Sequence, residues 1–178
     1  MTPIPKRPKL GLGCDDRVET EQARPGTYSL VLLSRSSGLI RIGKLGMLHV
    51  QPGFYVYLGS ALGPGGVRGR LAHHLQLSSR PHWHIDYLRA HATIEEIWYC
   101  LGRRRREHVW AYKLGRLPGA EVPLAGFGAT DCRCESHLYF FGKRSSAAQA
   151  MRAIDPLFGS AQILTEDQYR AVGKRKRL

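Results

Sequence analysis

The sequence predicts a domain of mixed α/β structure, in the α+β class: a small mixed, mainly antiparallel β-sheet flanked by helices. Three observations predict it. Short runs of aliphatic, aromatic and β-branched residues fill the first part of the central region. A glycine-rich stretch then leads into apolar residues at helical spacing. Strand-like and helix-like segments alternate from there to residue 142. Because 178 residues correspond to about one domain, we expect a single core.

The first part of this region contains the strand-like runs. Residues 28–33 form the most apolar of them, and Ser36, Ser37 and Gly38 then form a turn. Two shorter runs follow, separated by glycines, and Pro52 and Gly53 turn the chain into the next strong run. The predicted strands cover residues 28–33, 39–42, 47–50 and 54–58.

The segment 59–66 carries four glycines and a proline, so it is predicted as a loop. A helix follows, because Val67, Leu71 and Leu75 recur at the spacing of one helix face, and Pro81 ends it. The remaining predicted elements are a short helix over 83–90, a strand over 93–100, a helix over 105–117, a long loop over 118–136 and a strand over 137–141.

The chain divides into three parts by composition. Residues 1–25 mix prolines with charges and show no periodicity, which predicts a disordered lead-in. Residues 26–142 hold the predicted elements and form the expected domain. Residues 143–178 are rich in basic residues and predict a C-terminal extension that is partly helical or disordered, with a basic tail at 174–177.

The charge balance points to an acidic partner. The chain has 27 Lys and Arg residues against 14 Asp and Glu residues, a net charge of +13. Nucleic acid is the commonest partner of such a chain, and DNA is the expected one here; a solvated arginine-rich surface is the alternative. The longest dense apolar run, 30–33, is far too short for a membrane span, and residues 1–12 lack the apolar core of a signal peptide. We therefore expect a cytoplasmic protein without a membrane partner.

Two tripeptides flank the first predicted sheet segment, Gly-Thr-Tyr at 26–28 and Tyr-Leu-Gly at 57–59. They are followed by the predicted helix that carries Arg70 and His74. This order resembles the GIY-YIG nuclease superfamily. The resemblance implies that superfamily's fold and a metal-dependent endonuclease that hydrolyses phosphodiester bonds in DNA.

Further phrases narrow the resemblance. Residues 55–66, 81–88 and 131–134 are similar to the Uri-type branch of small prokaryotic proteins within that superfamily. The resemblance covers about residues 25–142 and does not reach the tails. The asparagine that the superfamily usually carries near the C-terminal end of the core has no evident counterpart here.

The resemblance implies roles for individual residues. The tyrosines of the two tripeptides, Tyr28 and Tyr57, match catalytic positions, as do Arg70 and, four residues later, His74. Glu107, on a later predicted helix, matches the position of the metal-binding glutamate. Arg68 competes with Arg70 for the arginine position.

Phosphodiester hydrolysis needs an activated water, charge relief at the phosphate and help for the leaving oxygen. Carboxylates are scarce in 26–142, which favours one hard cation, Mg²⁺ or Mn²⁺, held by one carboxylate with water and phosphate completing its shell. The resemblance implies that this carboxylate is Glu107. Arg70 would then offset charge on the pentacovalent phosphate. Tyr28 would act as general base or orient the water, and His74 would move a proton or bind phosphate. No organic cofactor is expected.

Each of these residues also has a structural interpretation. Tyr28 and Tyr57 could be ordinary core aromatics of their strands. Arg70 could be a solvated helix charge, and Glu107 could be a surface partner of Arg103, which lies four residues earlier.

Basic and histidine residues around these motifs are the candidate DNA contacts. His82, His84 and Asp86 form either a DNA-contacting or active-site rim, or a capped helix start with a buried, hydrogen-bonded histidine. The arginine run 103–106 opens a predicted helix, where the dipole does not favour cations, so it indicates a phosphate-binding ridge or a solvated turn. The expected DNA-binding residues are Arg68, His73, His82, His84, Arg103, Arg104 and Arg133.

Cys132, Cys134 and His137 form a C-x-C-x₂-H pattern. Zinc sites usually have four ligands, so zinc binding here is one interpretation and a buried thiol pair that stabilises the long loop is the other. Cys14 and Cys100 are not expected to be ligands.

Three functional hypotheses follow. The first is the metal-dependent endonuclease; the second is a catalytically inactive nucleic-acid-binding module on the same fold; the third is a zinc-binding interaction protein. Catalysis is favoured if Arg70 and Glu107 line one cleft with Tyr28 and Tyr57, and the binding module is favoured if Glu107 points into solvent. The third hypothesis predicts stoichiometric zinc. The sequence leaves the oligomeric state open.

Overall fold

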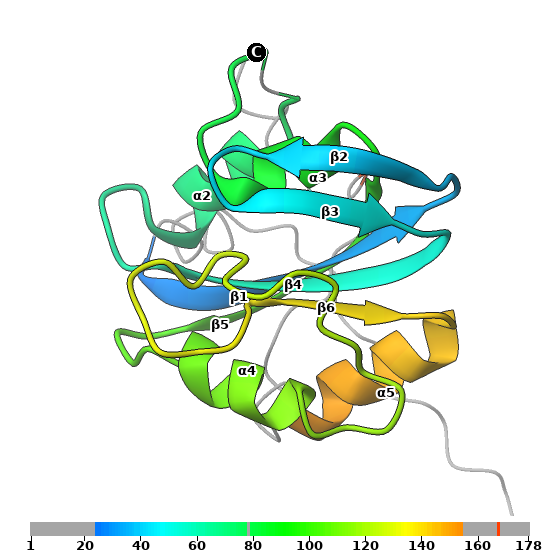
Figure 1. Cartoon of the computed structure of the whole chain (residues 1–178). Coiled ribbons are helices and arrows are strands. Elements are labelled where there is room, and N and C mark those ends of the chain that lie inside the picture. The colour runs from blue at the N-terminus through cyan, green and yellow to red at the C-terminus, as the bar shows by residue number, and fades with distance from the viewer. Residues whose placement is uncertain (1–23, 78, 155–166, 168–178) are drawn as a thin grey trace, which may run out of the picture.

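The computed structural model describes residues 24–77, 79–154 and 167, and it is built around a four-stranded sheet (Figure 1). The strand order is β5-β1-β4-β6, and every neighbouring pair is antiparallel. A separate antiparallel hairpin, β2-β3, lies outside this sheet. The α+β class is therefore confirmed. The strands are β1 (Gly26–Ser34), β2 (Gly38–Ile42), β3 (Gly46–Val50), β4 (Gly53–Ala61), β5 (Thr93–Leu101) and β6 (Leu138–Phe141).

Each face of the four-stranded sheet is covered by its own layer (Figure 1). Helices α2 and α3, with the β2-β3 hairpin, lie on one side, while α4 and α5 lie on the other. Because successive strand residues point to opposite faces, Leu30 and Leu32 join the first core and Val31 joins the second. The helices are α2 (Gly66–His74), α3 (His84–Arg89), α4 (Glu107–Leu114) and α5 (Arg144–Ile154).

Several element boundaries differ from the sequence prediction. The predicted helix from Val67 does not reach Pro81, because α2 ends at His74. The predicted loop 59–66 is wrong at its start, because β1 pairs with β4 as far as Gly26 opposite Ala61, and this ladder keeps Gly59 in the strand. The predicted helix 105–117 is shorter at both ends. The arginine run therefore does not open the helix: Arg103 to Arg105 precede it, and Arg106 is its N-cap.

The folded unit continues past residue 142. Helix α5 buries Ala147, Met151 and Ile154 against the sheet face that carries Val31 and Val56. The part 143–178 is therefore helical at its start, and this helix belongs to the core. The expected lead-in at 1–23 and the basic tail at 174–177 lie outside the described residues. In the part of the chain that is described, no helix has the length and hydropathy that crossing a membrane requires.

Candidate functional site

The sheet register brings the two tripeptides together. Residues 26–28 of β1 lie opposite residues 59–61 of β4, and Tyr28 faces Gly59 directly. The Tyr28 ring lies across this position so closely that a Cβ atom at Gly59 would collide with its Cζ and Oη atoms. The missing side chain of Gly59 is therefore what gives the Tyr28 phenol its place.

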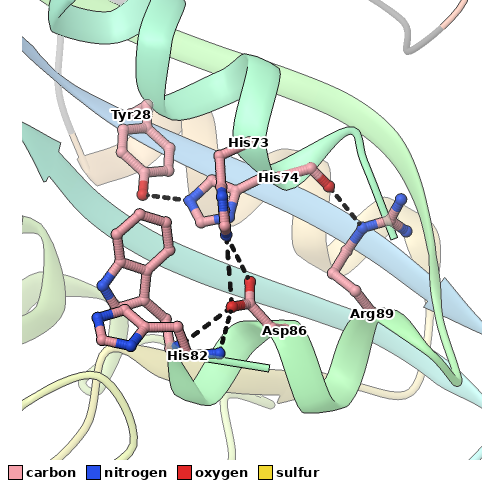
Figure 2. Close-up of polar contacts among 7 residues, drawn as sticks. Tyr28, His73, His74, His82, Asp86 and Arg89 are labelled. Atoms are coloured by element: carbon pink, nitrogen blue, oxygen red, sulfur yellow. Dashed lines mark hydrogen bonds and ion pairs between the residues drawn. The ribbon is translucent and has the colours of Figure 1, made fainter. Parts of the chain in front are cut away.

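The phenol of Tyr28 is held by α2. Its Oη lies 2.6 Å from His74 Nε2, and Figure 2 shows the two side chains directed at each other. The Tyr57 ring lies 6.4 Å from that of Tyr28 and 6.1 Å from that of His74, centroid to centroid. All three side chains are more than nine-tenths buried. The two tyrosines are therefore core aromatics of their strands, and they also form one polar cluster with His74, while their catalytic role stays a prediction.

Burial keeps this cluster uncharged. Desolvation, followed by the neighbouring Tyr57, holds the pKa of Tyr28 well above its usual value of 10.0. Desolvation also raises the pKa of Tyr57 to about 12, although the positive charge of Arg70 opposes the shift. The same cause lowers the pKa of His74 to about 3, so its imidazole is neutral near pH 7. His74 Nδ1 is buried without a hydrogen-bond partner.

A cavity of about 400 Å³ opens beside the cluster. It lies where β6 stops pairing with β4, since β6 covers β4 only over residues 54–57 and leaves Gly59 and Ser60 to line the cavity. The cavity walls include Tyr28, Tyr57, Arg70 and Glu107. Arg70 and Glu107 thus line one cleft with the two tyrosines, which is the arrangement that favours the catalytic hypothesis over the binding module.

Glu107 is the first residue of α4 and is only 3% exposed. This burial contradicts the alternative interpretation, in which Glu107 is a surface partner of Arg103. Its Oε2 atom is buried and has no hydrogen-bond partner, while Oε1 lies 3.6 Å from His108 Nε2. A buried carboxylate oxygen without a donor is costly unless a cation or water meets it. Glu107 therefore fits the role of a divalent-metal ligand.

Arg70 sits over the Trp83 ring, with its guanidinium carbon 4.2 Å from the ring centroid. The His73 ring packs edge-on against the same tryptophan at 4.3 Å. The spacing that places Arg70, His73 and His74 on one helix face thus brings all three to Trp83. This cation–π contact holds the Arg70 charge at the cavity wall.

Asp86 fixes the start of α3 (Figure 2). Its Oδ2 accepts the backbone N–H groups of His82 and Trp83 at 2.9 Å, and its Oδ1 lies 3.2 Å from His73 Nε2. Burial opposes ionisation, but these hydrogen bonds outweigh it and lower the pKa of Asp86. Asp86 therefore caps the start of α3, as the structural interpretation of this cluster predicted. His73, His74 and Asp86 lie close enough to share an ion, but His73 Nε2 already faces Asp86 and His74 Nε2 already faces Tyr28, which leaves His74 Nδ1 as the ring nitrogen of that residue without a partner.

The remaining expected DNA contacts fall into two groups. His82 and His84 line the cavity, where His84 Nδ1 accepts the Gly128 N–H at 3.0 Å and burial lowers the pKa of His84. The four arginines are exposed on the surface instead, and Arg133 lines a second cavity of about 430 Å³. These exposed arginines are Arg68, Arg103, Arg104 and Arg133.

The Cys and His residues of the long loop also lie together. Cys132 Sγ is 3.5 Å from His137 Nε2, and Cys134 Sγ is 3.4 Å from His108 Nδ1. Burial lowers the pKa of His137, and burial, with the neighbouring Cys132, raises that of Cys134 to about 11. His108 is a fourth member of this group, and the sequence offered no sign of it.

Sequence reasoning also missed Trp83 and Asp131, which line the cavity. Trp83 stands inside the phrase at 81–88, but nothing in its spacing indicates that Arg70 lies over it. His108 directly follows Glu107, yet its distance along the chain from Cys132 matches no common ligand spacing. Only the folded chain brings it to the cysteines.

Comparison with known proteins identifies the family but no individual relative. No curated protein and no solved structure matches the chain. The model of one family, described as "Domain of unknown function DUF123", matches residues 27–158. This match begins at the second residue of β1 and includes the other five strands and helices α2 to α5. The chain belongs to the DUF123 family.

Proposed function

We propose that this protein is a GIY-YIG-type endonuclease that uses one divalent metal ion to hydrolyse phosphodiester bonds in DNA. One observation carries the proposal: the buried carboxylate of Glu107 lines the same cavity as Arg70, Tyr28 and Tyr57. An anionic metal ligand and a fixed cation can supply the activated water and the charge relief that phosphodiester hydrolysis needs, and the phenol groups can position that water. The net charge of +13 supports DNA as the partner.

Glu107 would hold the ion, Mg²⁺ or Mn²⁺, because its Oε2 atom has no other partner. When bound, such an ion supplies positive charge to the phosphate and lowers the pKa of a coordinated water. A single protein carboxylate leaves most of the coordination shell to water and phosphate oxygens, which Mg²⁺ tolerates.

Arg70 would stabilise the negative charge that grows on the phosphate in the transition state. Its guanidinium is held over Trp83, so it needs little reorganisation when the substrate arrives. A guanidinium can also donate two parallel hydrogen bonds to phosphate oxygens, which a lysine cannot do.

Tyr28 would orient the attacking water rather than start as a phenolate, because burial keeps its hydroxyl protonated. When Tyr28 donates its O–H to the neutral His74 Nε2, the phenol oxygen keeps lone pairs that can accept a hydrogen bond from water. His74 then fixes the direction of the Tyr28 hydroxyl. Of the two roles expected for Tyr28, the water-orienting one has the support of these contacts.

The inactive DNA-binding module is the second candidate. It is favoured by the same pKa shifts, since neither Tyr28 nor His74 is a strong base at pH 7 in the protein alone. A module of this kind would bind DNA with strong salt sensitivity and leave it intact.

The experiment uses labelled single-stranded and duplex DNA with Mg²⁺, with Mn²⁺ or with chelator. The variants are Glu107→Gln, which keeps the side-chain size, and Glu121→Gln as a matched exposed control. We expect metal-dependent cleavage by the wild type and the control, and loss of cleavage in Glu107→Gln. Binding without cleavage in either metal would contradict the proposal and support the binding module.

The role of Arg70 is tested with Arg70→Ala and its neighbour on the same helix, Arg68→Ala. We expect Arg70→Ala to lower the cleavage rate by about 10²- to 10³-fold, as for other transition-state donors, with DNA affinity nearly kept. Arg68→Ala should retain cleavage, because Arg68 lies outside the cavity lining. Equal loss of affinity and rate in Arg70→Ala would contradict the assigned role.

A further inference from the structure

Four potential metal ligands meet between the long loop, α4 and β6. Cys132 and Cys134 come from the loop, His108 from the first turn of α4, and His137 from the residue before β6. One ligand atom from each lies within 4.8 Å of all the others. Three of these side chains are partly buried and His137 is fully buried.

Two of the separations between these ligand atoms match the sulfur–nitrogen edges of a zinc tetrahedron. Zinc binds sulfur at about 2.3 Å and imidazole nitrogen at about 2.0 Å, and a tetrahedral angle then places sulfur and nitrogen about 3.5 Å apart. Cys132 Sγ lies 3.5 Å from His137 Nε2, and Cys134 Sγ lies 3.4 Å from His108 Nδ1. Two separate thiol–imidazole hydrogen bonds could form at a distance from each other. Here both Cys–His pairs lie in one group of four ligand atoms, as binding of a single metal ion requires.

We propose that His108, Cys132, Cys134 and His137 bind one zinc ion in a closed tetrahedral site. Two thiolates and two neutral imidazoles balance the charge of Zn²⁺, so the complete site is neutral and suits a partly buried position. Binding displaces the two thiol protons to solvent. Four protein ligands leave no open position, which makes this a structural ion rather than the catalytic one.

The ion would tie the long loop to the start of α4. The cavity with the two tyrosines is lined by His108 and His137, and the second cavity is lined by His108, Cys132 and Cys134. The ion would therefore stand in the wall between the two cavities. With Nδ1 of His108 on zinc, its Nε2 faces Glu107 Oε1 at 3.6 Å, so the ion would also fix the helix turn that carries Glu107.

This inference does not rest on the proposed nuclease activity. Its test measures metal content of the full chain, purified without chelator and dialysed against metal-free buffer. We expect one zinc ion per chain in the wild type and in Cys100→Ser, because Cys100 is a free thiol outside the cluster. Cys134→Ser should retain less than about a tenth of that zinc, since it removes a thiolate ligand.

Replacement of zinc by Co²⁺ gives a second readout. A tetrahedral site with two thiolates should show visible d–d bands and intense sulfur-to-cobalt charge transfer. This spectrum decides the question on the wild-type chain even if Cys134→Ser does not fold. Wild-type protein that holds no zinc and gives no such spectrum would overturn the inference, as would equal zinc loss in Cys100→Ser. Zinc without DNA cleavage would overturn only the proposed function.

Discussion

At the scale of single residues, Gly59 decides where the Tyr28 phenol lies. Any larger residue would place its Cβ against the Tyr28 ring. We predict that Gly59→Ala displaces Tyr28 from His74, lowers DNA cleavage at least about 10-fold and costs about 1–3 kcal/mol of stability through overpacking. The measurements are cleavage kinetics and urea unfolding.

Gly63→Ala is the matched control, because a Cβ at Gly63 meets no atom within 4 Å. It should leave both cleavage and stability near wild type. Full activity in Gly59→Ala would mean that the position of the Tyr28 phenol does not matter for the reaction.

His74 makes stability depend on pH. Burial lowers the pKa of His74 in the folded protein from 6.5 to about 3. Below about pH 6.5, His74 therefore binds a proton in the unfolded chain but not in the folded protein. The stability present above pH 6.5 is therefore lost as the pH falls, by up to about 1.4 kcal/mol per pH unit from this group. Between pH 6 and 4, we predict that His74→Gln lowers the slope of unfolding free energy against pH by about 1.4 kcal/mol per pH unit, which corresponds to one proton.

Urea unfolding of the wild type, His74→Gln and His49→Gln over this pH range checks the prediction. His49 is exposed on β3 and serves as the control, so its replacement should leave the slope unchanged. If His74→Gln follows the wild-type slope, the imidazole is not kept neutral by burial.

Some site residues could be predicted from the sequence and others could not. Tyr28, Tyr57, Arg70 and Glu107 stand in short local patterns, and the structure places all four on one cavity. His108 could not be predicted, because its partners lie in the long loop and the contact depends on tertiary packing.

At the scale of elements, most strands and helices could be predicted from local sequence patterns, but their ends could not. The β1-β4 ladder extends β4 through Gly59, because paired backbone groups outweigh the low strand propensity of glycine. Helix α4 starts at Glu107, after the exposed arginines rather than within them. A chain segment alone does not contain this information, since it depends on the neighbouring strand.

Helix α5 likewise shows that tertiary contacts, and not the local sequence, determine where the folded domain ends. Its apolar face is short, yet Met151 is fully buried and lies 3.4 Å from the Ser29 hydroxyl of β1, Sδ to Oγ. We predict that Met151→Ala lowers the free energy of unfolding by about 2–5 kcal/mol, because it leaves a cavity between helix and sheet.

Urea unfolding followed by circular dichroism measures this loss. The neighbouring Arg152→Ala is the control, since Arg152 is exposed, and it should stay within about 0.5 kcal/mol of wild type. A neutral Met151→Ala would mean that α5 is not part of the cooperative unit and that the folded domain ends near residue 142.

At the scale of the whole molecule, the two ends of the sheet carry different features. Antiparallel pairing places the start of β1, the end of β4 and the end of β5 together, and the cavity and the arginines after β5 lie at this end. The opposite end carries Arg35 after β1 and Lys143 after β6. Positive charge is present at both ends, so net charge alone does not indicate which end would bind DNA under the proposed function.

Salt dependence distinguishes the two ends. Each phosphate contact adds about 0.9 to the slope of log K against log salt, so removing two contacts should reduce that slope by about two. We predict this reduction for the Arg103→Gln/Arg104→Gln double variant and an unchanged slope for Arg35→Gln/Lys143→Gln. Because both pairs remove two exposed charges, the comparison cancels the effect of net charge. Equal reductions in the two variants would mean that DNA is held by the overall charge of the protein and not by the end that carries the cavity.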